Sequence, residues 1–226
     1  MTQQEDDRAR LEGVGRNYNR EMMLATRERT LEAIRRIAAG IRVGMSEEEG
    51  TEWARTVLRE AQMLRGWHGI KIRFGSNTLK TFNDPSAPGL VLQENDIYFV
   101  DIGPLWQKWE GDAGATFAVG GDPDMVRAAR DVRGVFDRVR EKWLAERLTG
   151  LALYEYASQV AVELGWRLNL ETPGHRLADF PHAALLDGAL AEVPFAPSSG
   201  LWVLEIQIRH PERAFGAFYE DLLLAL

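Results

Sequence analysis

Two acidic residues, Asp101 and Asp112, interrupt the apolar, strand-like stretch YFVDIGPLWQKWEGDAGATF (residues 98–117). An unpaired charge is unfavourable inside a folded core. If the chain reverses near residues 106–107, the two acids face each other across an antiparallel hairpin, with Cβ atoms about 5 Å apart. Two ionised carboxylates at that separation repel each other unless a cation lies between them. The spacing therefore predicts a cation site.

A second pair of acids repeats the pattern near the C-terminus. Glu205 lies within LWVLEIQI and Glu220 within AFYEDLLL, and both stretches are largely apolar. A turn near residues 212–213 sets these two acids opposite each other. Each acid alone is more simply explained as a surface residue of an amphipathic strand, but that explanation is weaker for two matched pairs. Carboxylate oxygens suit hard or borderline divalent cations, and with one histidine the set can hold two of them.

The elements that must position these acids follow from hydrophobic periodicity and turn signals. Helices are predicted over residues 1–43, 46–64, 122–148 and 151–165. Strands are predicted over residues 69–77, 96–106, 110–119, 200–210 and 214–226. Ser46 with Glu49 forms a capping box, and Asp122 before Pro123 is typical of a helix start. We therefore expect one α+β domain over residues 1–226, with a helical N-terminal segment of about residues 1–43.

Composition restricts the function further. The chain has 226 residues, a net charge of −7 and no cysteine. The negative charge argues against partners with anionic backbones or surfaces, so we expect no nucleic acid and no membrane. The polar start MTQQEDDRARLEG has no apolar core typical of a signal peptide, and no apolar run approaches the roughly 18 residues of a membrane span. We expect a cytoplasmic protein without disulfides.

The order of the candidate ligands resembles that of the pita-bread metallopeptidases, which include methionine aminopeptidase, aminopeptidase P, prolidase and creatinase. The turn TPGHRLADFPH carries His175 between the two acid pairs, and His182 follows seven residues later. The segment VGMSEEE also resembles the family's entry into its catalytic domain. The resemblance covers residues from about 15 to the end. It implies a pita-bread fold, a curved antiparallel sheet covered by helices.

The resemblance also implies a dinuclear metal centre with a bridging hydroxide. Its ligands would be Asp101, Asp112, His175, Glu205 and Glu220. Asp112 and Glu220 would be shared by both ions. We expect Mn²⁺ from the oxygen-rich ligand set, with Co²⁺, Zn²⁺ and Fe²⁺ as alternatives.

Catalytic and substrate contacts are expected from the same resemblance. Glu205 would also move a proton, and His182 would donate to the substrate carbonyl or the developing oxyanion. His68, in WHGI, resembles the HGI segment of methionine aminopeptidase and is expected to contact substrate. His210, before Pro211, is expected to reach the mouth of the site.

The function we expect is an exopeptidase of the Xaa-Pro type, a dipeptidase or aminopeptidase, acting on short peptides as a homodimer. Two departures from the family keep alternatives open. GHRLA replaces the usual GHGIG, and LKTFNDP lacks the histidine that prolidase-like members carry there. A creatinase-like hydrolase or lyase is therefore one alternative. A methionine aminopeptidase-like enzyme or a non-catalytic peptide-binding protein is another.

Overall fold

A seven-stranded antiparallel sheet forms the centre of the part of the chain that the computed structural model describes, residues 3–180 and 188–225. In spatial order its strands are β1 (Lys71–Phe74), β2 (Asp96–Ile102), β5 (Ala113–Val119), β9 (Gly216–Leu222), β8 (Trp202–Arg209) and β6 (Arg167–Leu168), and β7 (His175–Arg176) also pairs with β8. A separate hairpin joins β3 (Leu105–Trp106) to β4 (Trp109–Glu110).

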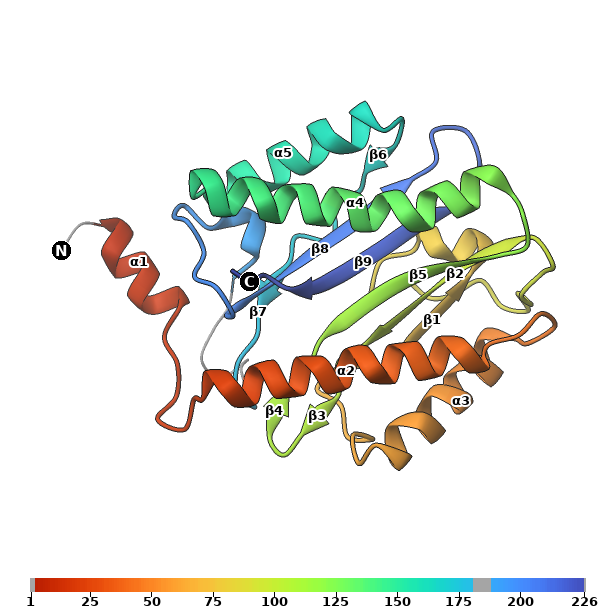
Figure 1. The fold of residues 1–226 in the computed structure, drawn as a ribbon, viewed down its shortest axis with the longest axis horizontal. Coiled ribbons are helices and arrows are strands. Elements are labelled where there is room, and N and C mark those ends of the chain that lie inside the picture. Colours follow the sequence, from red (N-terminus) through yellow and green to blue (C-terminus); the bar gives the residue numbers. More distant parts are fainter. Residues whose placement is uncertain (1–2, 181–187, 226) are drawn as a thin grey trace.

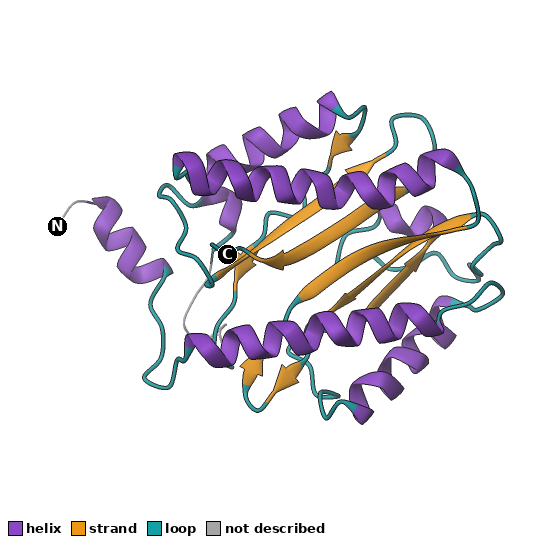
Figure 2. Ribbon diagram, in the orientation of Figure 1, coloured by secondary structure: helices purple, strands orange, loops and turns teal. Residues whose placement is uncertain are grey.

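Helices cover this sheet, so the predicted α+β architecture is confirmed (Figures 1 and 2). They are α1 (Gln3–Leu11), α2 (Arg20–Gly40), α3 (Glu47–Glu60), α4 (Pro123–Glu146) and α5 (Gly150–Glu163), with short 3-10 turns η1 (Gly75–Leu79) and η3 (Leu190–Glu192). In Figure 1, α2 and α3 run beside β1, β2 and β5, whereas α4 lies over β5, β8 and β9, and α5 packs beside α4 near β6.

The strands divide their side chains between two faces. On β2, Tyr98, Val100 and Ile102 join the apolar cluster beneath α2 and α3, whereas Phe99 and Asp101 point to the opposite face. Successive side chains of a strand alternate in this way. Each large apolar side chain fully buried under a helix contributes about 1.5–3 kcal/mol. The helix face therefore stabilises the sheet, and the other face is available for chemistry.

Local signals set the helix starts. Ser46 and Glu49 form the predicted capping box, with backbone-to-side-chain distances of 3.2 and 2.8 Å. Asp122 accepts hydrogen bonds from the N–H groups of the second and third helical residues, each at 3.1 Å, and Pro123 is the first residue of α4. Both caps satisfy donors that a helix start otherwise leaves free.

The predicted continuous helix over residues 1–43 is wrong. The structure has α1 and α2 separated by residues 12–19, which include Gly13 and Gly15. Asn19 then caps α2 by accepting from the N–H groups of Glu21 and Met22. The helical periodicity of α2 gives no information about the segment before its cap.

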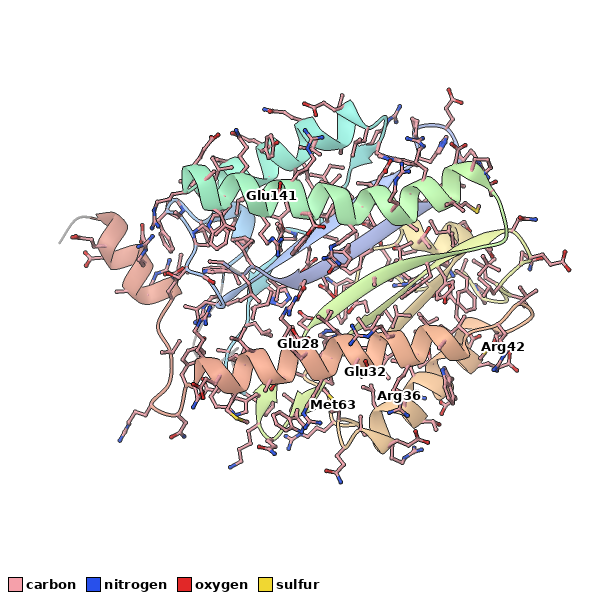
Figure 3. All side chains as sticks on the ribbon, viewed as in Figure 1. Glu28, Glu32, Arg36, Arg42, Met63 and Glu141 are labelled. Carbon is pink, nitrogen blue, oxygen red and sulfur yellow. The ribbon has the colours of Figure 1, made fainter. Side chains whose placement is uncertain are left out.

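Charged side chains line the solvent side of α2. Figure 3 labels Glu28, Glu32 and Arg36 along this helix, all of them exposed, whereas Met63 beyond α3 is buried. None of the described helices combines the length and apolar composition that crossing a membrane requires.

The register of the first acid pair also differs from the prediction. Asp101 pairs with Gly114, and the same register continues through Leu105 and Glu110 of the β3–β4 hairpin. The turn consists of Gln107 and Lys108, which have positive φ values of 56° and 94°. The turn therefore lies one residue later than expected, and the partner of Asp101 shifts by two residues.

The register of the second acid pair is confirmed. Glu205 on β8 faces Glu220 on β9, and the connection between these strands spans residues 210–215. Two carboxylates therefore point to the same side of adjacent strands.

Gly40, the last residue of α2, permits close packing of α2 against α3. A methyl group on Gly40 would lie 2.1 Å from Nε1 of Trp53, and that indole donates to the carbonyl of Ile37 at 3.0 Å. Gly134, within α4, has no neighbour within 4 Å of the same added methyl group among the described residues.

These two glycines provide a matched test of the packing. We expect Gly40→Ala to lower the free energy of unfolding by about 1–3 kcal/mol, because the indole must move. Gly134→Ala should raise it by about 0.5–1 kcal/mol, because alanine favours a helix and meets no obstacle. Urea unfolding followed by circular dichroism measures both. Equal effects of the two substitutions would contradict the packing described here.

Candidate metal centre

Three acids lie in one row across the sheet. Asp101 on β2 faces Gly114 on β5, Gly114 faces Glu220 on β9, and Glu220 faces Glu205 on β8. Directly paired residues of antiparallel strands point to the same side. The three carboxylates therefore project together from the face that the helices leave free. Asp101 and Glu220 are buried, and Glu205 is half-buried.

Gly114 keeps the middle of this row open. A methyl group on Gly114 would lie 2.6 Å from Cε1 of Phe218 and 3.0 Å from Oε1 of Glu220. Any other residue there would push a side chain between Asp101 and Glu220. The space between the carboxylates of Asp101 and Glu220 therefore depends on the glycine at position 114.

Asp112 and His175 complete the group. Asp112 lies just before β5 and is 2% exposed. Pairing of β7 with β8 sets His175 opposite Val203, two residues from Glu205. Nε2 of His175 lies 2.7 Å from Oδ2 of Asp112 and 3.5 Å from Oε1 of Glu205. The structure thus brings together all five residues that the sequence analysis proposed as ligands.

The other ring nitrogen fixes the orientation of His175. Nδ1 lies 2.7 Å from the carbonyl oxygen of Arg176. A carbonyl only accepts hydrogen bonds, so Nδ1 carries the hydrogen and Nε2 faces the carboxylates. A ring nitrogen that could bind a cation is thereby directed into the acid group.

Arg176, which stands in the GHRLA departure, connects His175 to the start of the chain. Its buried guanidinium donates to the carbonyls of Leu11 and Gly13 at 2.9 Å each, and to those of Leu177 and Leu201 at 3.0 and 2.8 Å. The residue that supplies the acceptor for Nδ1 of His175 is thus held by four backbone contacts.

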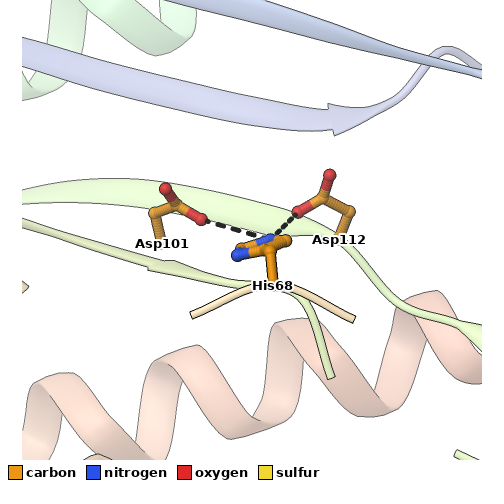
Figure 4. A group of neighbouring side chains, drawn as sticks. All are labelled: His68, Asp101 and Asp112. Carbon is orange, nitrogen blue, oxygen red and sulfur yellow. Dashed lines mark hydrogen bonds and ion pairs between the residues drawn. The ribbon is translucent and has the colours of Figure 1, made fainter. Parts of the chain in front are cut away.

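His68 also reaches the acids, as Figure 4 shows. Its Nε2 lies 3.1 Å from Oδ1 of Asp112 and 3.7 Å from Oδ1 of Asp101. Its Nδ1 lies 2.8 Å from the carbonyl of Gly69. The ring rests on Gly103, where an added methyl group would lie 1.9 Å from Cδ2 of His68. His68 precedes Asp101 by 33 positions in the sequence, yet the two side chains are neighbours in space.

Burial and mutual repulsion change the ionisation of the acids. Burial raises the pKa of Asp101 and of Glu205, and the charge of Asp112 adds to the effect. Burial and the charges of Asp112 and Asp101 raise the pKa of Glu220 well above its usual range. Burial alone would raise the pKa of Asp112 too, but contacts with His175 and His68 lower it to about 2. Asp112 is therefore the charged centre of the group.

The two histidines supply the compensating positive charge. Burial alone would lower their pKa values. The charge of Asp101 and the hydrogen bond to Asp112 instead raise the pKa of His68 to about 9. Contact with Asp112 and the charge of Glu205 raise the pKa of His175 to about 9. The acid group attracts cations in general, because opposite charges within a few ångströms favour the charged form.

The donor set fits divalent cations. Oδ1 of Asp101 and Oε1 of Glu220 are buried and have no hydrogen-bond partner among the described residues. Two groups of three could each hold an ion, His68 with Asp101 and Asp112, and Asp112 with His175 and Glu220, since their ligand atoms lie within 4.8 Å of one another. Asp112 belongs to both groups. An oxygen-rich set with imidazole suits first-row divalent metals.

A cavity of about 350 Å³ opens over the acid group. Phe99 and Phe218, with ring centroids 5.2 Å apart, form part of its apolar floor. Trp67 lies edge-on to His68 at 4.5 Å and to His175 at 5.3 Å. The site therefore combines a buried acidic end with aromatic walls.

The structure does not bring His210 to this cavity, and the expectation that it contacts substrate is corrected. Its Nδ1 accepts from the N–H groups of Glu212 and Arg213 at 3.1 and 2.9 Å, and its ring packs on Phe215. His210 thus organises the β8–β9 loop and is absent from the described residues that line the cavity. His182 lies outside the described residues, so its expected role stays a prediction.

Several residues of the cavity were not anticipated from the sequence. Trp67, Lys71, Phe82 and Gln207 line the site. The alternation of KIRF could have placed Lys71 and Arg73 on the face opposite Ile72. No comparable signal exists for Phe82, which lies in a loop.

Comparison with known proteins agrees with this arrangement. Residues 21–225 match the model of metallopeptidase family M24. No curated protein sequence matches the chain significantly.

Solved structures share the fold at low sequence identity. An X-Pro aminopeptidase from Thermotoga maritima superposes with a TM-score of 0.72 at 18% identity, covering 100% of this chain and 65% of its own. A prolidase from Pyrococcus horikoshii gives 0.70 at 16%, covering 91% and 58%. A methionine aminopeptidase from T. maritima gives 0.68 at 15%, covering 89% and 91%.

The chain thus spans less than two thirds of the first two of these structures and most of the third. The likeness confirms the predicted pita-bread fold. Since the family model covers nearly all of the sequence, the chain belongs to metallopeptidase family M24.

Proposed function

We propose that this chain is a metal-dependent exopeptidase that cleaves short peptides of the Xaa-Pro type, as a dipeptidase or an aminopeptidase. The observation that carries the proposal is the convergence of four acids and two histidines in the lining of one cavity. So many buried carboxylates repel one another unless cations neutralise them.

Two divalent ions are proposed, with Mn²⁺ as the expected metal. Asp112 would be shared, because it belongs to both groups that could hold an ion. Glu220 belongs to one of these groups, and its sharing is proposed from the family resemblance alone. Asp101 would complete one site, and His175 with Glu205 the other. Cations held there would polarise the substrate carbonyl and lower the pKa of an attacking water.

The protein groups around the ions would orient substrate and move protons. Glu205 is proposed to move a proton, because its side chain is 15% exposed, whereas that of Asp112 is 1% exposed. Nε2 of His68 points into the acid group and could donate to a substrate oxygen that replaces Asp112 as its partner. In this proposal, these residues serve as general acid and base groups for the bound substrate.

The substrate class is proposed from cavity size and lining. A volume of about 350 Å³ lies at the lower end for small-molecule sites, which suits a short peptide. Phe99, Phe218 and Trp67 offer apolar surface to a proline ring. The similar structures named X-Pro aminopeptidase and prolidase favour the same class.

A methionine aminopeptidase-like activity is the second candidate. This chain covers 91% of the methionine aminopeptidase structure, and His68 lies in the WHGI segment beside the acids. The homodimer and the cytoplasmic location stay predictions.

A peptide panel distinguishes the two candidates. With Mn²⁺ added, we expect hydrolysis of dipeptides and tripeptides with proline in second position, and no release of methionine from Met-Ala-Ser. Chromatography of released amino acids provides the measurement. Turnover of Met-Ala-Ser alone would support the second candidate, and a metal-loaded protein that cleaves no peptide would reject both.

Replacement of the shared acid should abolish metal binding. Asp112→Asn removes the charge that belongs to both groups, so we expect metal affinity to fall more than about 100-fold, the upper range for loss of an outer-shell partner. Asp137→Asn on α4 is a matched control that should retain metal. Metal content after dialysis measures both variants. An Asp112→Asn protein that binds metal like the control would contradict the assignment.

The stabilisation by metal should depend on pH. Without metal, the raised pKa values of Asp101, Glu205, His68 and His175 mean that the folded site holds more protons than the unfolded chain. These extra protons stabilise the folded state. The stabilisation is fully present below the ordinary carboxyl pKa and is lost as the pH rises to about 9. Cations replace these protons.

We therefore expect Mn²⁺ to raise the melting temperature more at about pH 8 than at about pH 5.5. Differential scanning calorimetry with and without metal provides the measurement, with Mg²⁺-free buffer as reference. An equal increase at both pH values would show that the titrating groups do not bind the ion.

A further inference from the structure

A lysine continues the row of acids at the edge of the sheet. Lys71 on β1 pairs directly with Asp101 on β2, which is followed across the sheet by Gly114, Glu220 and Glu205. β1 is the first strand of the sheet order. Lys71 therefore projects from the same face as the acids, and it lines the cavity.

Three basic side chains line the cavity together with the acids, namely Lys71, Lys80 and Arg73. The ammonium of Lys71 lies 4.3 Å from the ring centroid of Phe82, and neither lysine has a carboxylate oxygen within 4.0 Å among the described residues. Glu171 on the cavity wall is paired with Arg209 at 3.4 Å, so it does not neutralise the lysines.

Arg73 differs from Lys71, because its guanidinium is hydrogen-bonded to a neighbouring loop. Its Nη1 donates to Oγ of Ser86 at 2.7 Å, and its Nη2 donates to the carbonyls of Thr81 and Asp84 at 3.0 and 2.7 Å. The guanidinium thus holds the loop that carries Phe82. Burial and the neighbouring charge of Arg73 lower the pKa of Lys71, although the charge of Asp101 acts in the opposite direction. Lys71 therefore lies between a second cation and Asp101, and its ammonium forms no ion pair among the described residues.

Such an arrangement favours an anion supplied by a ligand. A half-buried ammonium gains from a carboxylate partner, because charge-assisted hydrogen bonds are the stronger ones. Adjacent strands lie about 4.8 Å apart, and successive peptide residues are about 3.8 Å apart. A peptide whose cleaved bond lies over the acids can therefore place a carboxylate near Lys71.

We propose that Lys71, in a cavity that Lys80 also lines, forms a subsite for a carboxylate of the substrate. This proposal rests on the proposed peptidase function and names the substrates that the site prefers. The carboxylate has two possible sources, the acidic side chain of the first residue or the free C-terminus of a dipeptide.

Two peptide pairs distinguish the sources. Glu-Pro against Gln-Pro tests the side chain, and Ala-Pro against Ala-Pro-amide tests the C-terminus. We expect kcat/KM of the Mn²⁺-loaded protein to be about tenfold higher for the charged member of at least one pair, the magnitude of one hydrogen bond to a charged group.

Variants assign the preference to the lysine. Lys71→Met should reduce the ratio of kcat/KM values within the charge-sensitive pair to about one, and Lys71→Arg should retain the wild-type ratio. Lys142→Met, on α4, is the matched control. No preference in the wild-type protein, or a preference that survives Lys71→Met, would overturn the proposal while leaving a peptidase intact.

Failure of the proposed function has a different signature. If no peptide is cleaved, calorimetric titration of the metal-loaded protein with the same four peptides still tests the subsite. Tighter binding of a charged member that is lost in Lys71→Met supports it, and equal binding within both pairs overturns it.

Discussion

Repulsion among buried carboxylates is the constraint on which this structure depends. Asp101, Glu220 and Glu205 lie in one row, and Asp112 adds a fourth acid beside its middle, two residues before Gly114. The row is possible because Gly114 leaves its centre open and because His68 and His175 supply positive charge in the metal-free state. The helices stabilise only the other face of the sheet, so the acids keep a free side on which a cation and a substrate can be bound.

Strand register determines whether this arrangement exists. A slip of one residue would turn every acid of a strand to the helix face. The turn at Gln107–Lys108 and the loop over residues 210–215 therefore have functional importance, although neither touches the acids. His210, which the sequence suggested as a substrate contact, contributes by holding the second of these connections.

Features that depend on a local sequence pattern were predicted correctly from the sequence. Features that depend on the conformation of a turn or loop were not. Glu205 and Glu220 face each other because their two apolar strands are joined by one loop, and this pairing was predicted from the sequence. The capping box of Ser46 and Glu49 is also evident from the sequence. The first hairpin was misplaced because Gln107 and Lys108 adopt positive φ without the glycine or asparagine that usually signals it. The position of Lys71 beside Asp101 required the strand order, which no periodicity contains.

The guanidinium of Arg176 links the first residues of the chain to the candidate metal centre. It joins the carbonyls of Leu11 and Gly13, more than 160 positions earlier, to the residue whose own carbonyl aims the imidazole of His175. Removal of the chain ahead of α2 would take away two of the four carbonyls that hold this guanidinium, and those of Leu177 and Leu201 would remain. The N-terminal segment also packs on β8, because Glu12 accepts from the indole of Trp202, so it supports both the sheet and the residue that orients the imidazole.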